Sequence, residues 1–184
     1  MRTGALLCLV VVMISTSPQR VLGQVPGIEL AVSYQTLRSQ DQKFTIGLNV
    51  DVAANMGSVL GIVAEAGGVH KSESSPFLST RTQMFNFGAG PRLNARTRSS
   101  VLFVQVVGGL VRNQSSVTAE DFEASGSRTR FMFQPGVGAT LMLGKRWGIT
   151  GEFDYRRLFL KLSADGEKKD DEIRGLIGVR IVFD

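Results

Sequence analysis

Apolar and polar residues alternate one by one in the last two segments of the chain, and this two-residue period runs almost to its end. In the segment 173–183, Arg174 and Arg180 stand at even positions, whereas the odd positions carry Ile173, Ile177, Val179, Ile181 and Phe183. The segment 147–160 repeats the pattern. Successive side chains of a β-strand point to opposite faces, so a period of two predicts strands with one charged and one apolar face.

Eight segments show this pattern or a nearly apolar variant of it: 28–37, 44–53, 59–69, 84–93, 101–111, 131–142, 147–160 and 173–183. Each has about ten residues or more, which a tilted strand needs to cross the apolar core of a bilayer, whereas soluble strands usually have about five or six. In 101–111, only Gln105 indicates which face is polar. The sequence therefore predicts an all-β fold: an eight-stranded antiparallel up-and-down transmembrane β-barrel with apolar side chains facing lipid.

Two prolines, Pro91 and Pro135, fall inside predicted strands. Proline cannot donate a hydrogen bond to a strand ladder. We therefore expect both side chains on the outward face, with a bulge or a local bend at each position.

The connections between the segments differ in length. Those at 38–43, 54–58, 94–100 and 143–146 are short, and those at 70–83, 112–130 and 161–172 are longer and rich in Ser, Thr, Gly and charge. We expect the longer ones to be solvated loops, because short periplasmic turns and long extracellular loops characterise outer-membrane barrels. Two aromatic girdles are predicted: Tyr34, Phe44, Phe85, Phe131, Phe133, Tyr155 and Phe159 near the outer interface, and Trp147 and Phe183 near the periplasmic one.

The first residues have the layout of an export signal. Arg2 precedes an apolar run at 5–14, and small residues near Gly23 suit cleavage, so residues 1–23 are predicted to be a signal peptide and 24–184 the barrel domain. A buried N-terminal strand or an uncleaved anchor is the alternative. Cleavage removes Cys8, the only cysteine, and lowers the net charge from +5 to +3, because Arg2 and Arg20 leave with it. Disulfides and thiolate metal sites are then excluded, and the charge does not favour nucleic acid.

Taken together, these features resemble the small eight-stranded outer-membrane β-barrels of Gram-negative bacteria, the OmpA/OmpX-like superfamily. Phe-Gly-Ala-Gly-Pro at 87–91 and Pro-Gly-Val-Gly at 135–138 add to the likeness. The resemblance implies that Val179, Ile181 and Phe183 form the signal read by the barrel-assembly machinery, although Asp184 follows the final aromatic residue. It also implies periplasmic chaperones during biogenesis, a monomer in the cell outer membrane, and contact with outer-membrane lipids and lipopolysaccharide.

Strand parity assigns a polar set to the barrel interior: Glu29, Ser33, Gln35, Asn49, Asp51, Glu65, Asn86, Arg92, Gln105, Gln134, Glu152, Asp154, Arg156, Arg174 and Arg180. An eight-stranded barrel has room inside for its own side chains or one small ligand. The charged members form a predicted lumen network, because stranding a buried ion costs several kcal/mol. We expect Glu152, Asp154 and Arg156 to pair with Arg174 and Arg180 on the adjacent strand. Inward glycines make room for these side chains and leave a thin channel as an alternative.

Few residues suggest chemistry. His70 and Ser72 share the lipid-facing parity, which resembles, by two residues only, the serine and histidine of outer-membrane lipid A deacylases. The sequence shows no metal-ligand cluster and no phosphate-binding glycine loop, so we expect no cofactor, no metal and no catalytic residue. Cations near the outer rim are expected to meet lipopolysaccharide phosphates: Arg38, Lys43, Lys71 and Arg81. Those in the opposite turns are expected to meet phospholipid headgroups: Arg96, Arg98, Lys145 and Arg146.

The sequence thus predicts an outer-membrane barrel with a structural or surface-interaction role, in which the long loops carry any recognition. A narrow pore for small ions or solutes is one alternative, and a lipid hydrolase is another. A third is a soluble exported barrel of the lipocalin kind, which requires polar side chains outside and apolar side chains inside.

Overall fold

The computed structural model describes residues 27–39, 43–44, 46–75, 78–119, 122–159 and 170–183. Their strands are β1 (Ile28–Ser39), β2 (Lys43–Phe44), β3 (Ile46–Asn55), β4 (Leu60–Ser75), β5 (Leu78–Arg96), β6 (Ser100–Ala119), β7 (Phe122–Met142), β8 (Trp147–Phe159) and β9 (Asp170–Phe183). In this part of the chain, no helix is long and apolar enough to cross a membrane. The predicted signal peptide, residues 1–23, lies outside the described residues.

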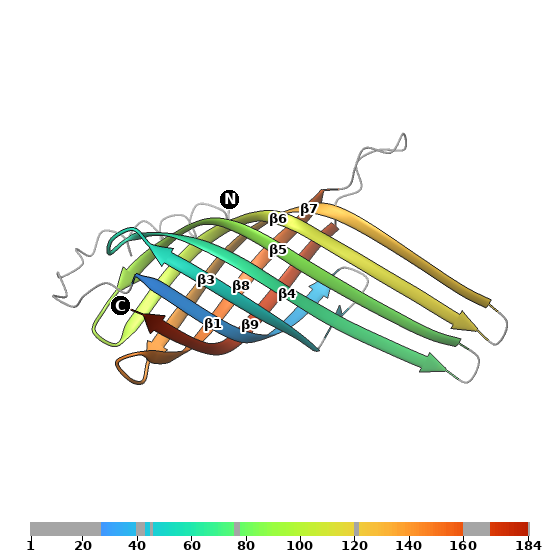
Figure 1. Cartoon of the computed structure of the whole chain (residues 1–184), viewed down its shortest axis with the longest axis horizontal. Coiled ribbons are helices and arrows are strands. Elements are labelled where there is room, and N and C mark those ends of the chain that lie inside the picture. The colour runs from blue at the N-terminus through green and yellow to red at the C-terminus, as the bar shows by residue number, and fades with distance from the viewer. Residues whose placement is uncertain are drawn as a thin grey trace, which may run out of the picture.

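All neighbouring strands pair antiparallel, and the first closes on the last (Figure 1). The β1–β9 ladder runs from Ile28↔Phe183 to Ser39↔Glu172. The short β2 continues β3 along the other edge of β1, with a one-residue change of register between Tyr34↔Leu48 and Leu37↔Phe44. The two pieces form one wall strand, so the barrel has eight, which confirms the predicted fold class.

The two faces of the barrel have opposite polarity. Leu48 and Ile177 on the outside are 65% and 61% exposed, whereas Arg174 on the inside is fully buried. In β6, Val101, Phe103, Gln105 and Val107 are buried, so the odd face points inward as predicted. An apolar exterior over a charged interior contradicts the soluble lipocalin-like alternative. It is the arrangement that lipid requires of a barrel.

Four adjacent strands are much longer than the others. β4 to β7 have 16 to 21 residues, against 12 to 14 in β1, β8 and β9. In Figure 1 their ends run past the rest of the barrel, at the end opposite to the short turns. We call this part, made of 70–75, 78–85, 110–119 and 122–131, the projecting sheet.

The projecting sheet shows that two loop predictions were wrong. Segments 70–83 and 112–130 are hairpins, with ladders that continue to Ser75↔Leu78 and Ala119↔Phe122. Their polarity on both faces hid the two-residue period. In the third predicted loop, 161–172, β9 begins at Asp170, and the preceding residues lie outside the described ones.

The prolines interrupt the ladders without a bulge. Pairing between β5 and β6 is missing between Ala89↔Gly108 and Arg92↔Gln105, yet the register is the same on both sides of the gap. The β7–β8 ladder has a similar gap around Pro135, with the register again unchanged. No residue is inserted at either site, so neither site is a bulge, and the local bend given as the other possibility stays a prediction. Pro91 is exposed and Pro135 is half-buried, and each still pairs with its other neighbouring strand.

Aromatic side chains line the outside near both ends of the barrel. Those that are 39% to 65% exposed are Tyr34, Phe85, Phe131, Phe133 and Phe159 toward the projecting sheet, and Trp147 and Phe183 at the short-turn end. Tyr155 is half-buried, and the side chain of Phe44 lies outside the described ones. Aromatic girdles of this kind mark the two membrane interfaces of a barrel.

Candidate functional site

The barrel interior holds the polar residues that strand parity assigns to it. Every one of them is buried except Glu152, which is half-buried and whose side chain is still only 6% exposed. They come from all the wall strands, because each strand turns alternate residues inward. Their contacts form ion pairs and hydrogen bonds in successive layers along the barrel axis.

Arg174 on β9 is the centre of this network. Its Nε donates to Asp154 Oδ2 at 2.7 Å, and its Nη2 donates to Glu65 Oε2 at 2.7 Å. Glu152 lies 3.8 Å from the same guanidinium, so the expected pairing of β8 acids with Arg174 is present. The Nη1 atom of Arg174 donates to Gln35 Oε1 and to Asn49 Oδ1. One buried cation thus ties together four other strands.

Arg180 pairs with acidic residues of β1 and β3. Its Nη1 donates to Glu29 at 2.8 Å and its Nη2 to Asp51 at 3.3 Å. The expected pairing with the β8 acids is therefore wrong for this residue. On β8, Arg180 lies opposite Gly148, four residues before Glu152, whereas on β1 it lies opposite Ala31, only two residues from Glu29.

The short-turn end contains partners that parity did not assign to the interior. Arg96 donates to Glu29 at 2.6 Å, and Asn55 donates to the same carboxylate at 2.9 Å. Asn94 is also buried here and donates to Asn55. Arg96 was predicted to lie in a turn beside phospholipid headgroups. The alternation of β5 continued by three residues would have placed it inside.

Two arginines stack on one phenylalanine inside the barrel, next to the short-turn end. The guanidinium carbons of Arg92 and Arg180 lie 4.4 Å and 4.8 Å from the centre of the Phe103 ring. Such cation–π contacts strengthen when they are desolvated. Arg92 also donates to Gln105, which in turn donates to Glu152, and so links the two arginine layers.

Toward the projecting sheet, the network ends at Arg156. Its Nε donates to Gln134 at 2.8 Å, and its Nη1 lies 3.6 Å from Glu172. Glu172 was assigned to a loop, although it has the same parity as Arg174. Neither Arg174 nor Arg180 pairs with Arg156, so the predicted grouping of Arg156 with them is also wrong.

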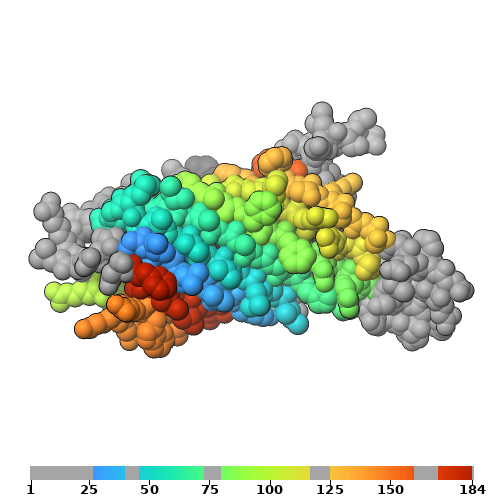
Figure 2. Space-filling model, viewed as in Figure 1, coloured from blue at the N-terminus to red at the C-terminus, as the bar shows by residue number. Residues whose placement is uncertain are grey.

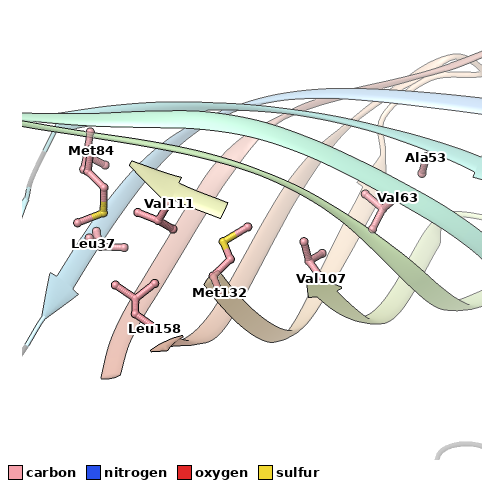
Figure 3. Close-up of a cluster of buried hydrophobic side chains, with 9 residues drawn as sticks. Leu37, Ala53, Val63, Met84, Val107, Val111, Met132 and Leu158 are labelled. Carbon is pink, nitrogen blue, oxygen red and sulfur yellow. The ribbon is translucent and has the colours of Figure 1, made fainter. Parts of the chain in front are cut away.

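Beyond Arg156, apolar side chains fill the interior. In Figure 3, Leu37, Met84, Val111, Met132 and Leu158 point toward one another from different strands. All are at most 4% exposed. We call them the apolar plug. Because they follow the polar residues along the strands, they stand between the charge network and the projecting end.

The described residues give little support for a catalytic pair at His70 and Ser72 or for a metal site. His70 and Ser72 are both exposed on the outward face of β4, as parity predicts, but no hydrogen bond joins them in the described part of the chain. Among the described residues, no group of three His, Cys, Asp or Glu side chains is placed to hold a metal ion.

The rim cations divide between the two faces of the wall. Arg38 and Arg81 are exposed and point outward, whereas Lys71 has the inward parity and is half-buried. The side chain of Lys43 lies outside the described ones. The structure adds Arg112, exposed on the outward face of β6, which the loop prediction had hidden. In Figure 2 the outer surfaces of β4 to β7 form one continuous face along the molecule.

The residues predicted to form the assembly signal lie on the outside of β9. Val179, Ile181 and Phe183 are 39% to 47% exposed. Ile181 lies between Leu30 of β1 and Trp147 of β8 in the sheet, at the seam where the barrel closes.

Solved structures with the same fold are outer-membrane barrels. The attachment invasion locus protein Ail of Yersinia pestis is 12% identical with a TM-score of 0.59, and the match covers 85% of this chain and 96% of that one. Neisserial surface protein A is 12% identical with a TM-score of 0.58, and the match covers 85% of this chain and 96% of that one. A major outer membrane protein from Thermus thermophilus is 10% identical with a TM-score of 0.62, and the match covers 85% of this chain and 99% of that one. At these identities, the matches show the fold alone.

No curated protein matches the chain significantly. The family model described as "Outer membrane protein beta-barrel domain" matches residues 5–179, nearly the whole sequence. This match agrees with the closed barrel, its apolar exterior and its aromatic girdles, and it places the protein in the outer membrane. The chain belongs to the outer membrane protein β-barrel domain family.

Proposed function

We propose that this protein is a sealed outer-membrane barrel with a structural and surface-interaction role, which displays the projecting sheet outside the cell. The observation that carries the proposal is the filled interior. Arg92, Arg156, Arg174 and Arg180 are at most 1% exposed, and the apolar plug lies beyond them. A continuous water path would have to pass both an ion-paired layer and an apolar one. This arrangement favours a structural and surface-interaction role over a role as a pore.

The sealed interior predicts an electrically silent protein. Purified barrel reconstituted in planar bilayers at high salt is expected to give no discrete conductance steps. Insertion is checked separately by the change in gel mobility on boiling, which folded barrels show. Reproducible steps from heat-modifiable protein, absent from a boiled sample, would contradict the sealed barrel and favour the narrow pore.

The orientation of the barrel supports the surface role. Short turns of outer-membrane barrels are periplasmic and long hairpins are extracellular. The projecting sheet then stands outside, where its Ser, Thr and Gln side chains meet water and the sugars of the outer leaflet. Periplasmic chaperones and the barrel-assembly machinery complete the proposed partners, and a single chain closes its own sheet, which supports a monomer.

The last strand supplies the proposed assembly signal. Phe183→Ser is expected to lower the amount of heat-modifiable protein in the outer membrane several-fold, because the final aromatic residue is lost. Phe153→Ser is the matched control, since Phe153 is also a lipid-facing aromatic residue, 54% exposed against 47% for Phe183. If the two variants lose the same amount of heat-modifiable protein, the loss comes from missing lipid contact, and Phe183 is not part of an assembly signal.

A further inference from the structure

The layer of the interior around Arg174 holds more carboxyl groups than cations. Three acidic side chains, each at most 6% exposed, lie within ion-pair distance of this guanidinium: Glu65, Glu152 and Asp154. No other Lys or Arg of the described residues lies that close to any of the three. If all three were ionised, two buried negative charges would lack a partner, which is strongly disfavoured in an interior with little room for water.

Asp154 has an oxygen that lacks a hydrogen-bond donor. Its Oδ2 accepts from Arg174 Nε at 2.7 Å, but its buried Oδ1 accepts no hydrogen bond from the described residues. Oδ1 lies against Gly136 of the neighbouring β7, which has no side chain to donate. Glu65 differs, because Arg174 donates to one of its oxygens and Gln134 to the other. Since buried polar atoms nearly always have a partner, a donor to Asp154 Oδ1 is missing.

Glu152 is the group that can supply this donor. It stands two residues before Asp154 on the inward face of β8, and the two carboxyl groups are within hydrogen-bonding reach of each other. Glu152 Oε1 accepts from Gln105 at 2.6 Å and lies 3.8 Å from Arg174. Asp154 has the much shorter contact with the cation, so Asp154 is the ionised member of the pair and Glu152 the neutral one.

We propose that Glu152 and Asp154 share one buried proton, which Glu152 Oε2 holds and donates to Asp154 Oδ1. The proton provides the missing donor and removes one of the two excess charges. Two carboxyl groups that share a site resist joint ionisation in this way.

The surroundings of the pair do not replace the proton. Charged groups face it from five strands: Asp51 on β3, Glu65 on β4, Arg92 on β5, Arg156 on β8 and Arg174 on β9. Arg92 and Arg156 pair with acids of their own, which are Asp51 and Glu172. From β6 and β7, the neutral amides of Gln105 and Gln134 face the same layer.

A proton that is bound only in the folded barrel links stability to pH. The ordinary pKa of a glutamic acid is about 4.3, so the unfolded chain is ionised at this position above about pH 5.5. Unfolding then releases one proton, and the unfolding constant rises about tenfold for each pH unit. The barrel is therefore expected to be more stable in mild acid than at neutral pH.

The first test is urea unfolding of the reconstituted barrel between about pH 5.5 and about pH 7.5, where the unfolded chain is ionised. The amide in Glu152→Gln can accept from Gln105 and donate to Asp154 as the protonated acid does, but it binds no proton. The unfolding constant of the parent, divided by that of this variant, should rise about tenfold per pH unit. Parallel curves for the two proteins would overturn the proposal.

Glu29→Gln is the matched control. Glu29 is also a buried acid, but it pairs with Arg96 at 2.6 Å and with Arg180 at 2.8 Å, so it has cations enough to stay ionised. This variant is expected to lose stability at every pH while its curve stays parallel to that of the parent. All variants must keep the mobility change on boiling.

Infrared spectroscopy of the folded parent detects the proton directly and needs no variant. At about pH 7.5, well above the ordinary range of carboxyl groups, we expect the C=O band of a protonated carboxyl group, identified by its shift in D2O. Glu152→Gln and Asp154→Asn should each remove the band, because the remaining carboxyl group then pairs with Arg174, whereas Glu29→Gln should keep it. A parent without the band, or a band that survives both substitutions, contradicts the shared proton. Stability that depends on sodium concentration instead of pH would assign the excess charge to a bound cation and also overturn the proposal.

Discussion

Replacing Arg174 with leucine is expected to lower the free energy of unfolding by about 3–5 kcal/mol, the usual cost of removing one partner from a buried ion pair. The substitution leaves Glu65 and Asp154 without their shortest contacts, both 2.7 Å, in an interior that has little room for water. Urea unfolding of the reconstituted barrel, followed by gel mobility without boiling, measures the change.

The matched control is Arg157→Leu. Arg157 also pairs with a carboxylate of the neighbouring strand, at 2.9 Å, but its side chain is 40% exposed, so its loss should change stability by less than about 1 kcal/mol. Adding Glu65→Gln and Asp154→Asn to the Arg174 variant should recover part of the loss, because the stranded charges disappear. If the Arg174 and Arg157 variants are equally stable, the interior network does not stabilise the barrel.

A second large effect is expected at Gly138. A Cβ atom at this position would overlap the ring of Phe103 and approach the backbone oxygen of Gly151. The ring cannot move aside easily, because Arg92 and Arg180 stack on it. Gly138→Val should therefore destabilise the barrel by about 1–3 kcal/mol through overpacking, measured by the same urea unfolding.

Gly108→Ala is the control for this substitution. Gly108 lies on the outward face of β6, and a Cβ there meets nothing within 4 Å. Its replacement should leave stability unchanged within about 0.5 kcal/mol. In a double-mutant cycle, Phe103→Ala should absorb much of the cost of Gly138→Val, because the cavity accepts the valine. Strictly additive losses would show that the ring is not the obstacle.

Sequence reasoning reached the strand count, the closed barrel and the inward face of each strand, since all three depend on the two-residue period inside the membrane. It failed where the two faces of a strand have the same environment, because polar residues then occur on both faces. Above the membrane, both faces of 112–119 and 122–130 meet water, so Ser and Thr occur at even and odd positions alike. The hairpins therefore looked like loops, and Arg112 was assigned to one of them.

The contacts of the interior were less predictable than its members. Parity gives the face of a side chain but not its depth along the barrel, which depends on register between strands. Arg180 illustrates this limit, because its partner Glu29 lies 151 positions away in sequence and reaches it only through the β1–β9 closure. Arg96 and Glu172 were missed for a simpler reason, because the predicted strands ended a few residues too early.

The pairing of β1 with β9 also has a kinetic consequence. Ile28 lies opposite Phe183, so the ladder that completes the barrel joins almost the two extremes of the described chain. Until β9 arrives, the growing sheet has two open edges, which are prone to pair with other chains. Contacts so distant in sequence form slowly, because a long loop must close before they contribute. A chain that lacks β9 therefore keeps β1 and β8 as open edges, because β9 is the strand that pairs with both of them.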